Sequence, residues 1–269
     1  MLLVALRGGE GFLKVTGEVG TGKTLLCRRL LNLLDDEFVT AYIPNPFLTP
    51  TALRMALAEE LGIEFARNIG QHRLLKLISE RLVELNAAGK RVVLLLDEAQ
   101  ALPDDSLEAL RLLTNLETEK DKLLLVVLFG QPELDARLAL PQFRQLRQRI
   151  LFSHRLRPLS ASESTAYLGH RLAIAGGAGR AVFDTAALKA LTRASGGIPR
   201  LLNILGHKAL MAGFGQGRTQ VGAAQVRQAI ADTEGVGSPS RWRWPWKLGA
   251  LSTAATLAGV GFLLLGAPT

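Results

Sequence analysis

The hydrophobic positions of residues 1–157 follow two periods, one typical of strands and one typical of helices. Short apolar or β-branched runs predict strands at Phe12–Thr16, Phe38–Ile43, Val92–Leu96, Leu123–Phe129 and Ile150–Leu156. Leucines at helical spacing and helix-start signals between these runs predict helices at Leu25–Leu34, Pro50–Leu61, Leu74–Leu85 and Ser106–Leu116. The runs VVLLL and LLLVVLF contain no polar position, as expected for strands buried on both faces. The pattern predicts a three-layer α/β fold with a parallel sheet.

After Pro158 only the helical period remains. Ser160 and Glu163 form an S-x-x-E capping box that begins a first helix, and a Gly-Gly pair ends it. Asp184 is the expected N-cap of the next helix. The helices predicted in this part are 160–176, 184–196, Pro199–Phe214 and Ala224–Thr233. Residues 158–234 are therefore predicted to form a small helical lid domain behind the core.

The segment between the first strand and the first helix reads GEVGTGKT and matches G-x-x-x-x-G-K-[ST] in full. In this context glycines let backbone N–H groups curl around phosphate oxygens at the positive end of a helix dipole. Lys23 is expected to reach the β- and γ-phosphates of a nucleoside triphosphate, and the Thr24 hydroxyl is expected to bind Mg²⁺. An ordinary glycine-rich turn is the alternative. The residues predicted to bind the nucleotide here are Gly17, Glu18, Val19, Gly20, Thr21, Gly22, Lys23, Thr24 and Leu25.

Polar residues follow two of the buried strands and are candidates for hydrolysis. In RVVLLLDEAQ, Asp97 is expected to hold the Mg²⁺ shell and Glu98 to polarise the attacking water as a general base. The alternative for this acidic pair is an N-cap of the following helix. Gln131, after the next buried strand, is expected to orient the water or sense the γ-phosphate. A turn residue before Pro132 is the alternative there.

Two further sites carry arginines. QFRQLRQRI places Arg144, Arg147 and Arg149 just before the last strand, where an arginine can reach the γ-phosphate of a neighbouring subunit. Arg149 is the first candidate because it directly precedes the apolar residues of that strand, and Arg147 is the second. A solvated basic face or a DNA-facing patch is the alternative. In GGIPRLLN, Arg200 begins a lid helix and is expected to reach the nucleotide from there; a surface arginine after a tight turn is the alternative.

The C-terminal residues have a different composition. Residues 235–247 are predicted to be a linker that ends in the basic, tryptophan-rich RWRWPWK. Residues 248–269 carry no charge, and as a helix they would extend about 33 Å, enough to cross a bilayer. The tryptophans suit a membrane interface, and the adjacent basic residues predict that the preceding domains are cytoplasmic. A single transmembrane anchor is predicted, with a hydrophobic tail that packs on the protein or on a partner as the alternative.

The composition further limits the class of protein and its possible ligands. A hydrophobic content of 48% excludes general disorder. The net charge of +8 is compatible with nucleic acid, an anionic membrane surface or polyphosphate ligands, and does not choose among them. The single cysteine, Cys27, excludes an internal disulfide. The N-terminal MLLVALR is too short for a signal peptide and is predicted to be the end of a helix.

The motifs, taken in order, resemble those of a known family. GEVGTGKT, LLLDEAQ, a polar strand end, LRQRI and GGIPR resemble an AAA+ ATPase. More narrowly, DEAQ with LFGQPEL, QRI and SGGIPRLLN resembles the general-secretion-pathway A-type (ExeA-like) ATPases, and within them the MshM-type proteins of mannose-sensitive haemagglutinin (MSHA) pilus biogenesis. The resemblance covers residues 1–233. It assigns Gly17, Gly22, Lys23 and Thr24 to the phosphate loop, Asp97 and Glu98 to Walker B, Gln131 to sensor 1 and Arg200 to sensor 2.

This resemblance implies a homo-oligomeric ring at the bacterial inner membrane. Its cytoplasmic ATP hydrolysis would support assembly of a type IV pilus or a type II secretion apparatus, with inner-membrane assembly proteins as partners and no nucleic acid. The main rival is a DNA-transaction AAA+ ATPase, such as a transposition accessory protein or a helicase loader. The charge-free C-terminal residues argue against that rival. A nucleotide-gated scaffold that hardly hydrolyses ATP is a further class, and the intact Glu98 argues against it.

Overall fold

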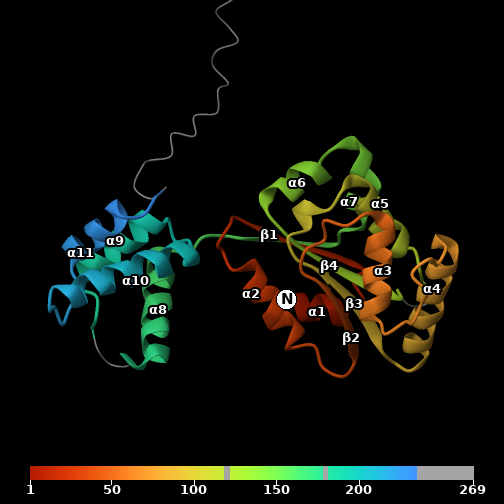
Figure 1. Cartoon of the computed structure of the whole chain (residues 1–269), viewed down its shortest axis with the longest axis horizontal. Helices are drawn as coiled ribbons and strands as arrows, with labels where there is room; N and C mark the ends of the chain where they lie inside the picture. Colours follow the sequence, from red (N-terminus) through yellow and green to blue (C-terminus); the bar gives the residue numbers. More distant parts are fainter. Residues whose placement is uncertain (118–121, 178–180, 235–269) are drawn as a thin grey trace, which may run out of the picture.

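Five parallel strands form one sheet in the computed structural model, which describes residues 1–117, 122–177 and 181–234. The strands are β1 (Phe12–Gly17), β2 (Phe38–Ile43), β3 (Arg91–Leu96), β4 (Leu124–Gly130) and β5 (Phe152–Leu156). Their order across the sheet is β2-β3-β4-β1-β5, and every neighbouring pair is parallel (Figure 1). Because β1 lies between β4 and β5, the loop that follows β1 leaves from the interior of the sheet.

Helices cover both faces of this sheet. The core helices are α1 (Leu2–Arg7), α2 (Lys23–Leu31), α3 (Pro50–Glu60), α4 (Gln71–Ala87), α5 (Asp104–Leu113), α6 (Pro132–Leu138) and α7 (Arg144–Arg149), with short 3₁₀ turns at Ala99–Ala101 and Pro141–Phe143. The residues of β3 alternate between two buried clusters: Val93 and Leu95 pack with α1 and α2, whereas Leu94 and Leu96 pack with α3 to α7. Each such side chain contributes about 1.5–3 kcal/mol on burial. The predicted three-layer α/β core is therefore confirmed.

The remaining helices form a separate group (Figure 1). They pack around a hydrophobic cluster of their own. They are α8 (Ala161–Leu172), which continues into a wider turn at Ala173–Gly177, α9 (Thr185–Ser195), α10 (Pro199–Gly215) and α11 (Ala223–Ala231). Leu168, Leu191 and Leu202 are all buried in this cluster, one from each of the first three helices. Residues 158–234 thus contain a helical unit with its own core, and its role as a lid stays a prediction.

Local signals set the ends of several helices. The Thr49 side chain accepts a hydrogen bond from Ala52 N at 3.3 Å and caps α3. The Asp184 side chain accepts one from Ala187 N at 2.6 Å and caps α9. Gly196 ends α9 in the left-handed conformation, with φ 59°. These signals are local, so the sequence alone contains them.

Other boundaries differ from the predictions. α2 begins at Lys23 rather than at Leu25, because Gly22 in the left-handed region, with φ 100°, serves as its N-cap. β5 begins at Phe152 because Ile150 is the C-cap of α7. The helices α6 and α7 were not predicted, since six or seven residues are too few to show a helical period.

No helix within the described ranges is both long and apolar enough to cross a membrane. The predicted linker 235–247 and the predicted anchor 248–269 lie outside the residues that the structure describes.

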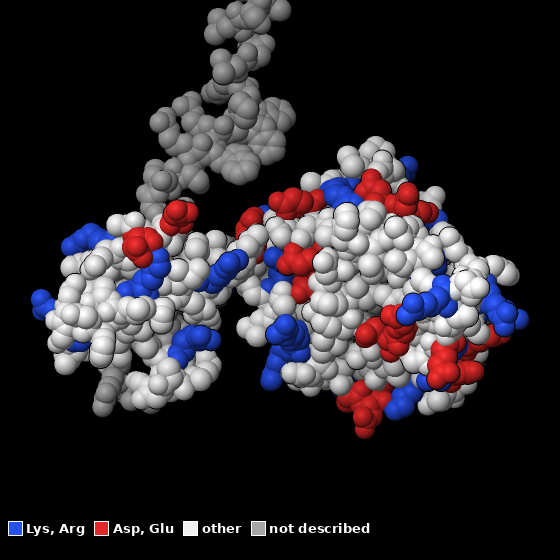
Figure 2. Space-filling model, viewed as in Figure 1, with Lys and Arg blue, Asp and Glu red and all other residues white. Residues whose placement is uncertain are grey.

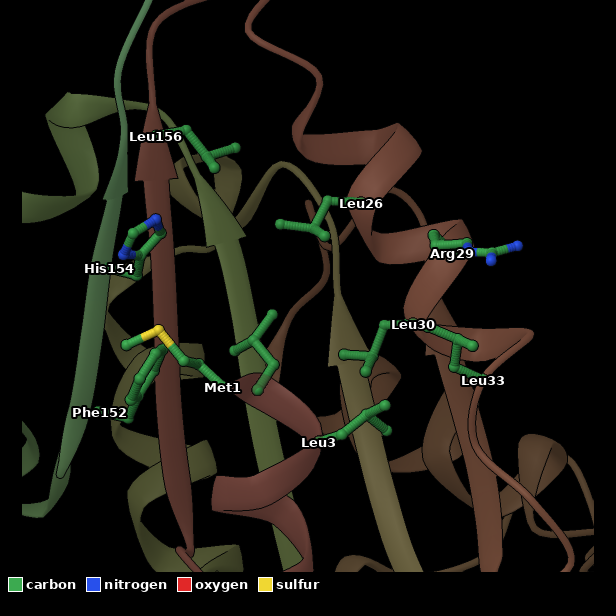
Figure 3. Close-up of a pocket in the computed structure, with 10 residues that line it drawn as sticks. Met1, Leu3, Leu26, Arg29, Leu30, Leu33, Phe152, His154 and Leu156 are labelled. Atoms are coloured by element: carbon green, nitrogen blue, oxygen red, sulfur yellow. The ribbon is translucent and has the colours of Figure 1, made fainter.

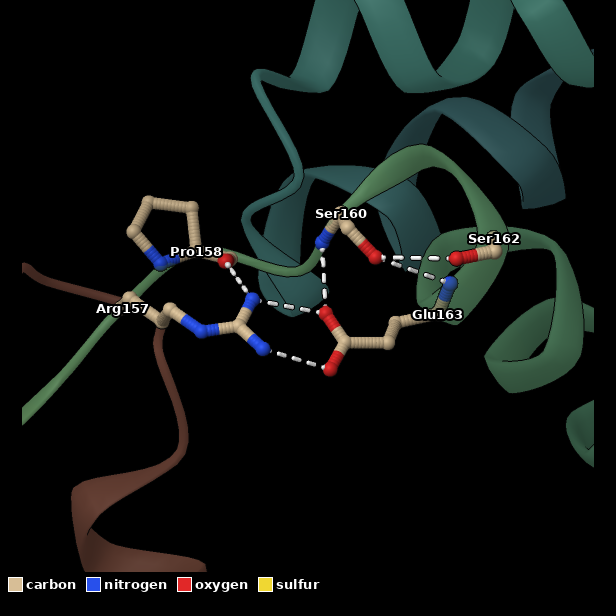
Figure 4. Close-up of polar contacts among 5 residues, drawn as sticks. All are labelled: Arg157, Pro158, Ser160, Ser162 and Glu163. Carbon is tan, nitrogen blue, oxygen red and sulfur yellow. Dashed lines mark hydrogen bonds and ion pairs between the residues drawn. The ribbon is translucent and has the colours of Figure 1, made fainter.

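An exposed ion pair holds the first turn of α8 at the point where the chain leaves the sheet (Figure 4). Both terminal nitrogens of Arg157 donate to the Glu163 carboxylate at 2.8 Å. Glu163 also accepts from Ser160 N at 2.8 Å, and Ser160 Oγ accepts from Glu163 N at 3.3 Å. The predicted capping box is confirmed. The Arg157 guanidinium, followed by the hydrogen bonds with Ser160, lowers the pKa of Glu163 from 4.5 to about 2.

We expect the stabilisation from this carboxylate to be lost in acid. Because the folded-state pKa of about 2 lies below the ordinary value of 4.5, the contribution of Glu163 to the free energy of unfolding is fully present above the ordinary value. It is lost as the pH falls toward the folded-state pKa. Thermal melts of the wild type and of Glu163→Gln should differ most at neutral pH and low salt, and should converge in acid. A difference in Tm that stayed constant throughout this range would contradict the expectation.

Candidate nucleotide-binding site

The loop between β1 and α2 has the backbone of a phosphate-binding turn. Gly20 and Gly22 adopt positive φ angles of 84° and 100°, which L-residues with side chains rarely adopt. At Gly17 the need is for space, since a Cβ there would lie 2.8 Å from Thr21 Oγ1. Thr21 Oγ1 itself donates to Glu18 O at 2.8 Å and braces the turn. The loop ends where α2 begins, at Lys23.

Lys23 is buried inside this loop, with 5% of its surface exposed. Its Nζ donates to Gly17 O at 2.9 Å and to Glu18 O at 3.1 Å. The ammonium group is therefore held at the centre of the loop, where phosphate oxygens can replace the two carbonyls as its acceptors. Thr24 follows on α2 and lines the same pocket, whereas the Leu25 side chain is largely exposed at the rim.

The acidic pair follows β3, as predicted, with the two carboxylates in different surroundings. Asp97 is 3% exposed, and its Oδ1 accepts from Glu98 N at 2.9 Å. Glu98 lines the pocket and, among the described residues, is the one non-glycine residue with positive φ, at 51°. Strained backbone of this kind is concentrated at functional sites. Burial opposes the charged form of Glu98, but hydrogen bonds from Gln100 and Gln131 and the charge of Lys23 outweigh it, so its pKa is lowered.

Gln131 meets Glu98 at the carboxyl ends of β3 and β4. It is the N-cap residue of α6, and its Nε2 donates to Glu98 Oε2 at 3.1 Å. Gln100 also contacts this pair: its Oε1 accepts from Gln131 N at 2.9 Å, and its Nε2 donates to Glu98 Oε2. Gln100 was not predicted as a site residue. Its only signal was its place in DEAQ, two residues after the acid.

The helix α6 is tied to both neighbouring parts of the site. Asp135 accepts from Thr16 Oγ1 at 2.8 Å and pairs with Lys14, and both of these residues lie on β1. Arg137 donates to Gln100 O at 2.8 Å and pairs with Asp104 at the start of α5. The position of Gln131 is therefore fixed relative to the phosphate loop on one side and to the acidic pair on the other.

The helical unit closes the pocket from the other side. Arg200 N donates to Gly20 O at 3.2 Å, and a Cβ on Gly20 would lie 2.7 Å from Arg200 Cβ. Tyr167 and Asn203 also line the pocket and are joined by a hydrogen bond of 2.8 Å from Asn203 Nδ2 to Tyr167 Oη. Neither residue was predicted, because each lies in a helix whose hydrophobic pattern indicates only packing. The pocket has a volume of about 510 Å³ and lies within the range typical of ligand sites.

Thr24 and Asp97 fit the predicted Mg²⁺ site. Both supply oxygen atoms, which Mg²⁺ prefers. Burial, followed by the charge of Asp97, raises the pKa of the Cys27 thiol to about 12. Cys27 is three residues after Thr24 and on the same face of α2. Asp97 is 3% exposed and is not among the residues that line the pocket itself.

The predicted arginine cluster lies apart from this pocket. Arg149 is half-buried and donates to Thr114 Oγ1 at 3.2 Å, at the end of α5. Arg147 is exposed and donates to Ala139 O at 3.1 Å, and Arg144 is exposed. None of the three lines the pocket of its own chain. The roles predicted for Arg147 and Arg149 stay predictions.

A second cavity lies between α1, α2 and the edge strand β5 (Figure 3). Its volume is about 290 Å³, and its lining is almost entirely apolar, with Leu3, Leu26, Leu30 and Phe152 among the contributors. Arg29 and His154 are the polar residues at its wall. This cavity has no carboxylate and no glycine-rich loop, so the candidate site for a phosphate ligand is the pocket at Lys23.

Comparison with known proteins agrees with this geometry. Residues 6–138 match a family model described as an AAA domain. The chain is 44% identical over 238 residues to general secretion pathway protein A of Aeromonas hydrophila, and the match covers 88% of this chain and 43% of that protein. The chain thus spans less than half the length of this relative.

Solved structures with low sequence identity share the fold. Cdc6p from Pyrobaculum aerophilum matches with a TM-score of 0.65 and 23% identity, covering 86% of this chain and 64% of that one. The ORC2 protein of Aeropyrum pernix matches with a TM-score of 0.62 and 19% identity, covering 87% and 65%. At these identities the likeness concerns the fold alone. Together with the 44% identical relative and the phosphate loop, it shows that the chain belongs to the AAA+ proteins of the general secretion pathway protein A type.

Proposed function

We propose that the chain hydrolyses ATP to support assembly of a type II secretion apparatus or a type IV, MSHA-like pilus at the bacterial inner membrane. The observation that carries the proposal is that Lys23, Glu98, Gln131 and Arg200 line one pocket. One pocket is thus lined by a group that can bind phosphate, a carboxylate that can act as a base, an amide, and a cationic side chain from the helical unit. The name of the 44% identical relative, general secretion pathway protein A, supports the choice of process.

The residues of the pocket divide the steps of hydrolysis. The N–H groups of the loop and Lys23 bind the phosphates, and Glu98 takes a proton from the attacking water. Gln131 donates to Glu98 and faces the same pocket, so its amide can donate to the water or to a phosphate oxygen instead. Thr24 and Asp97 would hold Mg²⁺, which when bound neutralises charge on the phosphate oxygens. Arg200 approaches from the helical unit and would add positive charge as the pocket closes.

We further propose that residues 248–269 anchor the protein to the membrane as a single span, with the ATPase domain in the cytoplasm. Their lack of charge and the tryptophans and basic residues of 241–247 support this. Ala250, Ala254 and Ala258 recur at small-x-x-x-small spacing, which suits packing against a partner span or a second copy. On the face of the core shown in Figure 2, acidic and basic side chains are interspersed, so that face offers no single basic surface for nucleic acid.

One comparison tests both proposals. We expect the full chain to enter the membrane fraction and to release phosphate from ATP, with stimulation by membrane vesicles rather than by duplex DNA. A chain that ends at Lys247 should be soluble and should keep basal turnover without this stimulation. Full-length Lys23→Ala measures background activity. Full-length protein that stays soluble would disprove the anchor, and stimulation by DNA alone would favour a DNA-transaction ATPase.

A further inference from the structure

Gln100 is the polar residue that links the candidate base to the end of β4. It lies in the 3₁₀ turn Ala99–Ala101, directly after Glu98 and Ala99. Its side-chain nitrogen donates to Glu98 Oε2, and its side-chain oxygen accepts from Gln131 N at 2.9 Å. Both ends of one amide are therefore used. Rotation of the amide would break both hydrogen bonds at once, so its orientation is fixed.

The turn that carries Gln100 is itself held in place. Arg137 of α6 donates to Gln100 O at 2.8 Å. A Cβ on Gly130 would lie 3.4 Å from Gln100 Oε1, so the amide packs directly against the end of β4. Contacts from α6 and from β4 thus leave the Gln100 side chain little freedom.

The carboxylate of Glu98 is held from one side only. Both amide donors, from Gln100 and Gln131, reach Oε2. Within residues 1–117, 122–177 and 181–234, no protein group donates to Oε1. Glu98 lines the pocket, so this second oxygen is the one available to a water molecule there. The backbone of Glu98 is in the left-handed region, with φ 51°, a conformation that persists only where the surrounding contacts hold it.

We propose that Gln100 is a positioning residue for ATP hydrolysis, which holds the Glu98 carboxylate so that Oε1 faces the attacking water. This inference rests on the proposed ATPase function. Gln131 donates to the same oxygen, yet its amide is also the group expected to contact the γ-phosphate. When Gln131 turns to the phosphate, Gln100 is the donor that still holds Glu98. In this arrangement Gln131 contacts the γ-phosphate, and Gln100 holds the Glu98 carboxylate in place.

Three substitutions separate the two halves of the Gln100 amide. Gln100→Leu removes the donor and the acceptor. Gln100→Glu keeps an acceptor for Gln131 N but cannot donate to Glu98 and adds a second negative charge beside it. Gln100→His offers a donor and an acceptor on its two ring nitrogens. The matched control is Gln220→Leu, which removes the exposed amide that donates to Ala181 O at 3.0 Å in the helical unit.

Steady-state ATPase kinetics and equilibrium binding of ATP test the proposal. We expect Gln100→Leu and Gln100→Glu to lower kcat by about 10- to 100-fold, because a misplaced base costs about this much. KM and the Kd for ATP should change by less than about twofold, since Gln100 does not line the pocket. Gln100→His should recover part of the lost kcat, and Gln220→Leu should match the wild type.

The outcomes distinguish this proposal from the function on which it rests. If Gln100→Glu turns over like the wild type, the amide only supports the backbone of Gln131 and the positioning role is wrong. A kcat of Gln100→Leu within about twofold of the wild type overturns it as well. If the wild type binds ATP but releases no phosphate above the Lys23→Ala background, the proposed ATPase function itself fails. Circular dichroism melts show whether each variant is folded.

Discussion

Lys23→Ala is expected to abolish tight ATP binding, whereas Glu98→Gln is expected to keep binding and lose turnover. The Lys23 ammonium is buried at the centre of the loop, within hydrogen-bond distance of two carbonyls that phosphate oxygens can replace. Each charge-assisted hydrogen bond contributes about 1.5–3 kcal/mol. Loss of the ammonium should therefore weaken the Kd for ATP by at least about 100-fold.

Glu98→Gln leaves the shape of the pocket almost unchanged. The amide oxygen of the new side chain can still accept from Gln100 or Gln131, but the side chain can no longer take a proton from water. A general base contributes about 10²–10⁴ in rate, so kcat should fall by this factor while the Kd for ATP stays within a few fold.

Calorimetry and phosphate release separate the two effects. Lys76→Ala and Glu80→Gln make the same chemical changes at an exposed pair on α4, with 3.7 Å between Lys76 Nζ and Glu80 Oε1, and both should behave like the wild type. A fully active Glu98→Gln protein would show that Glu98 is not the base. If Lys23→Ala bound ATP with normal affinity, the loop at Lys23 would not be the part of the site that binds the phosphates.

The parts of the fold that the sequence predicts are those with local causes. β3 and β4 are continuous apolar runs because both of their faces are buried, and such runs need no knowledge of their neighbours. The order of the strands across the sheet has no such local cause. β1 lies between β4 and β5, and this arrangement depends on how the helices pack on the two faces, which no periodicity records.

The same distinction applies to the candidate site. The loop glycines and Lys23 were predicted because phosphate binding requires those residue types at that spacing. Gln100 was not predicted, because its contact with Gln131 joins positions 31 residues apart. Tyr167 and Asn203 were missed for a similar reason, since the helical unit brings them to a pocket formed mostly by the core. A single sequence does not show which side chains reach a site only through tertiary contacts.

Arg149→Ala is expected to bind ATP nearly as well as the wild type and to hydrolyse it about 10³–10⁵ times more slowly, as for other lost arginine fingers. The prediction rests on the proposed ring assembly. Arg149 does not line the pocket of its own chain, and its guanidinium lies at the ends of α5 and α7, half-buried against Thr114. Arg147 and Arg144, both exposed on the same short helix, are compared as alanine variants in parallel.

A structural effect of this substitution has to be separated from a catalytic one. Arg149→Ala also removes the hydrogen bond of 3.2 Å to Thr114 Oγ1. Thr114→Val removes the same hydrogen bond, together with the one that Thr114 Oγ1 donates to Arg111 O at 2.8 Å, and keeps the guanidinium and the shape of the buried side chain. It should therefore keep the ATPase rate within a few fold of the wild type. If Thr114→Val is as slow as Arg149→Ala, the contact between α5 and α7 accounts for the loss.

Mixing two inactive proteins tests whether the arginine acts across a subunit interface. An Arg149→Ala subunit keeps its own phosphate loop, and a Lys23→Ala subunit keeps its own arginine. In a mixed ring, the first can bind ATP and receive the guanidinium of the second, so part of the lost phosphate release should return. A double variant, Lys23→Ala with Arg149→Ala, cannot supply the arginine and serves as the matched partner that gives no recovery. If co-assembly is demonstrated by cross-linking and the rate still does not rise, Arg149 acts within its own subunit or only in packing.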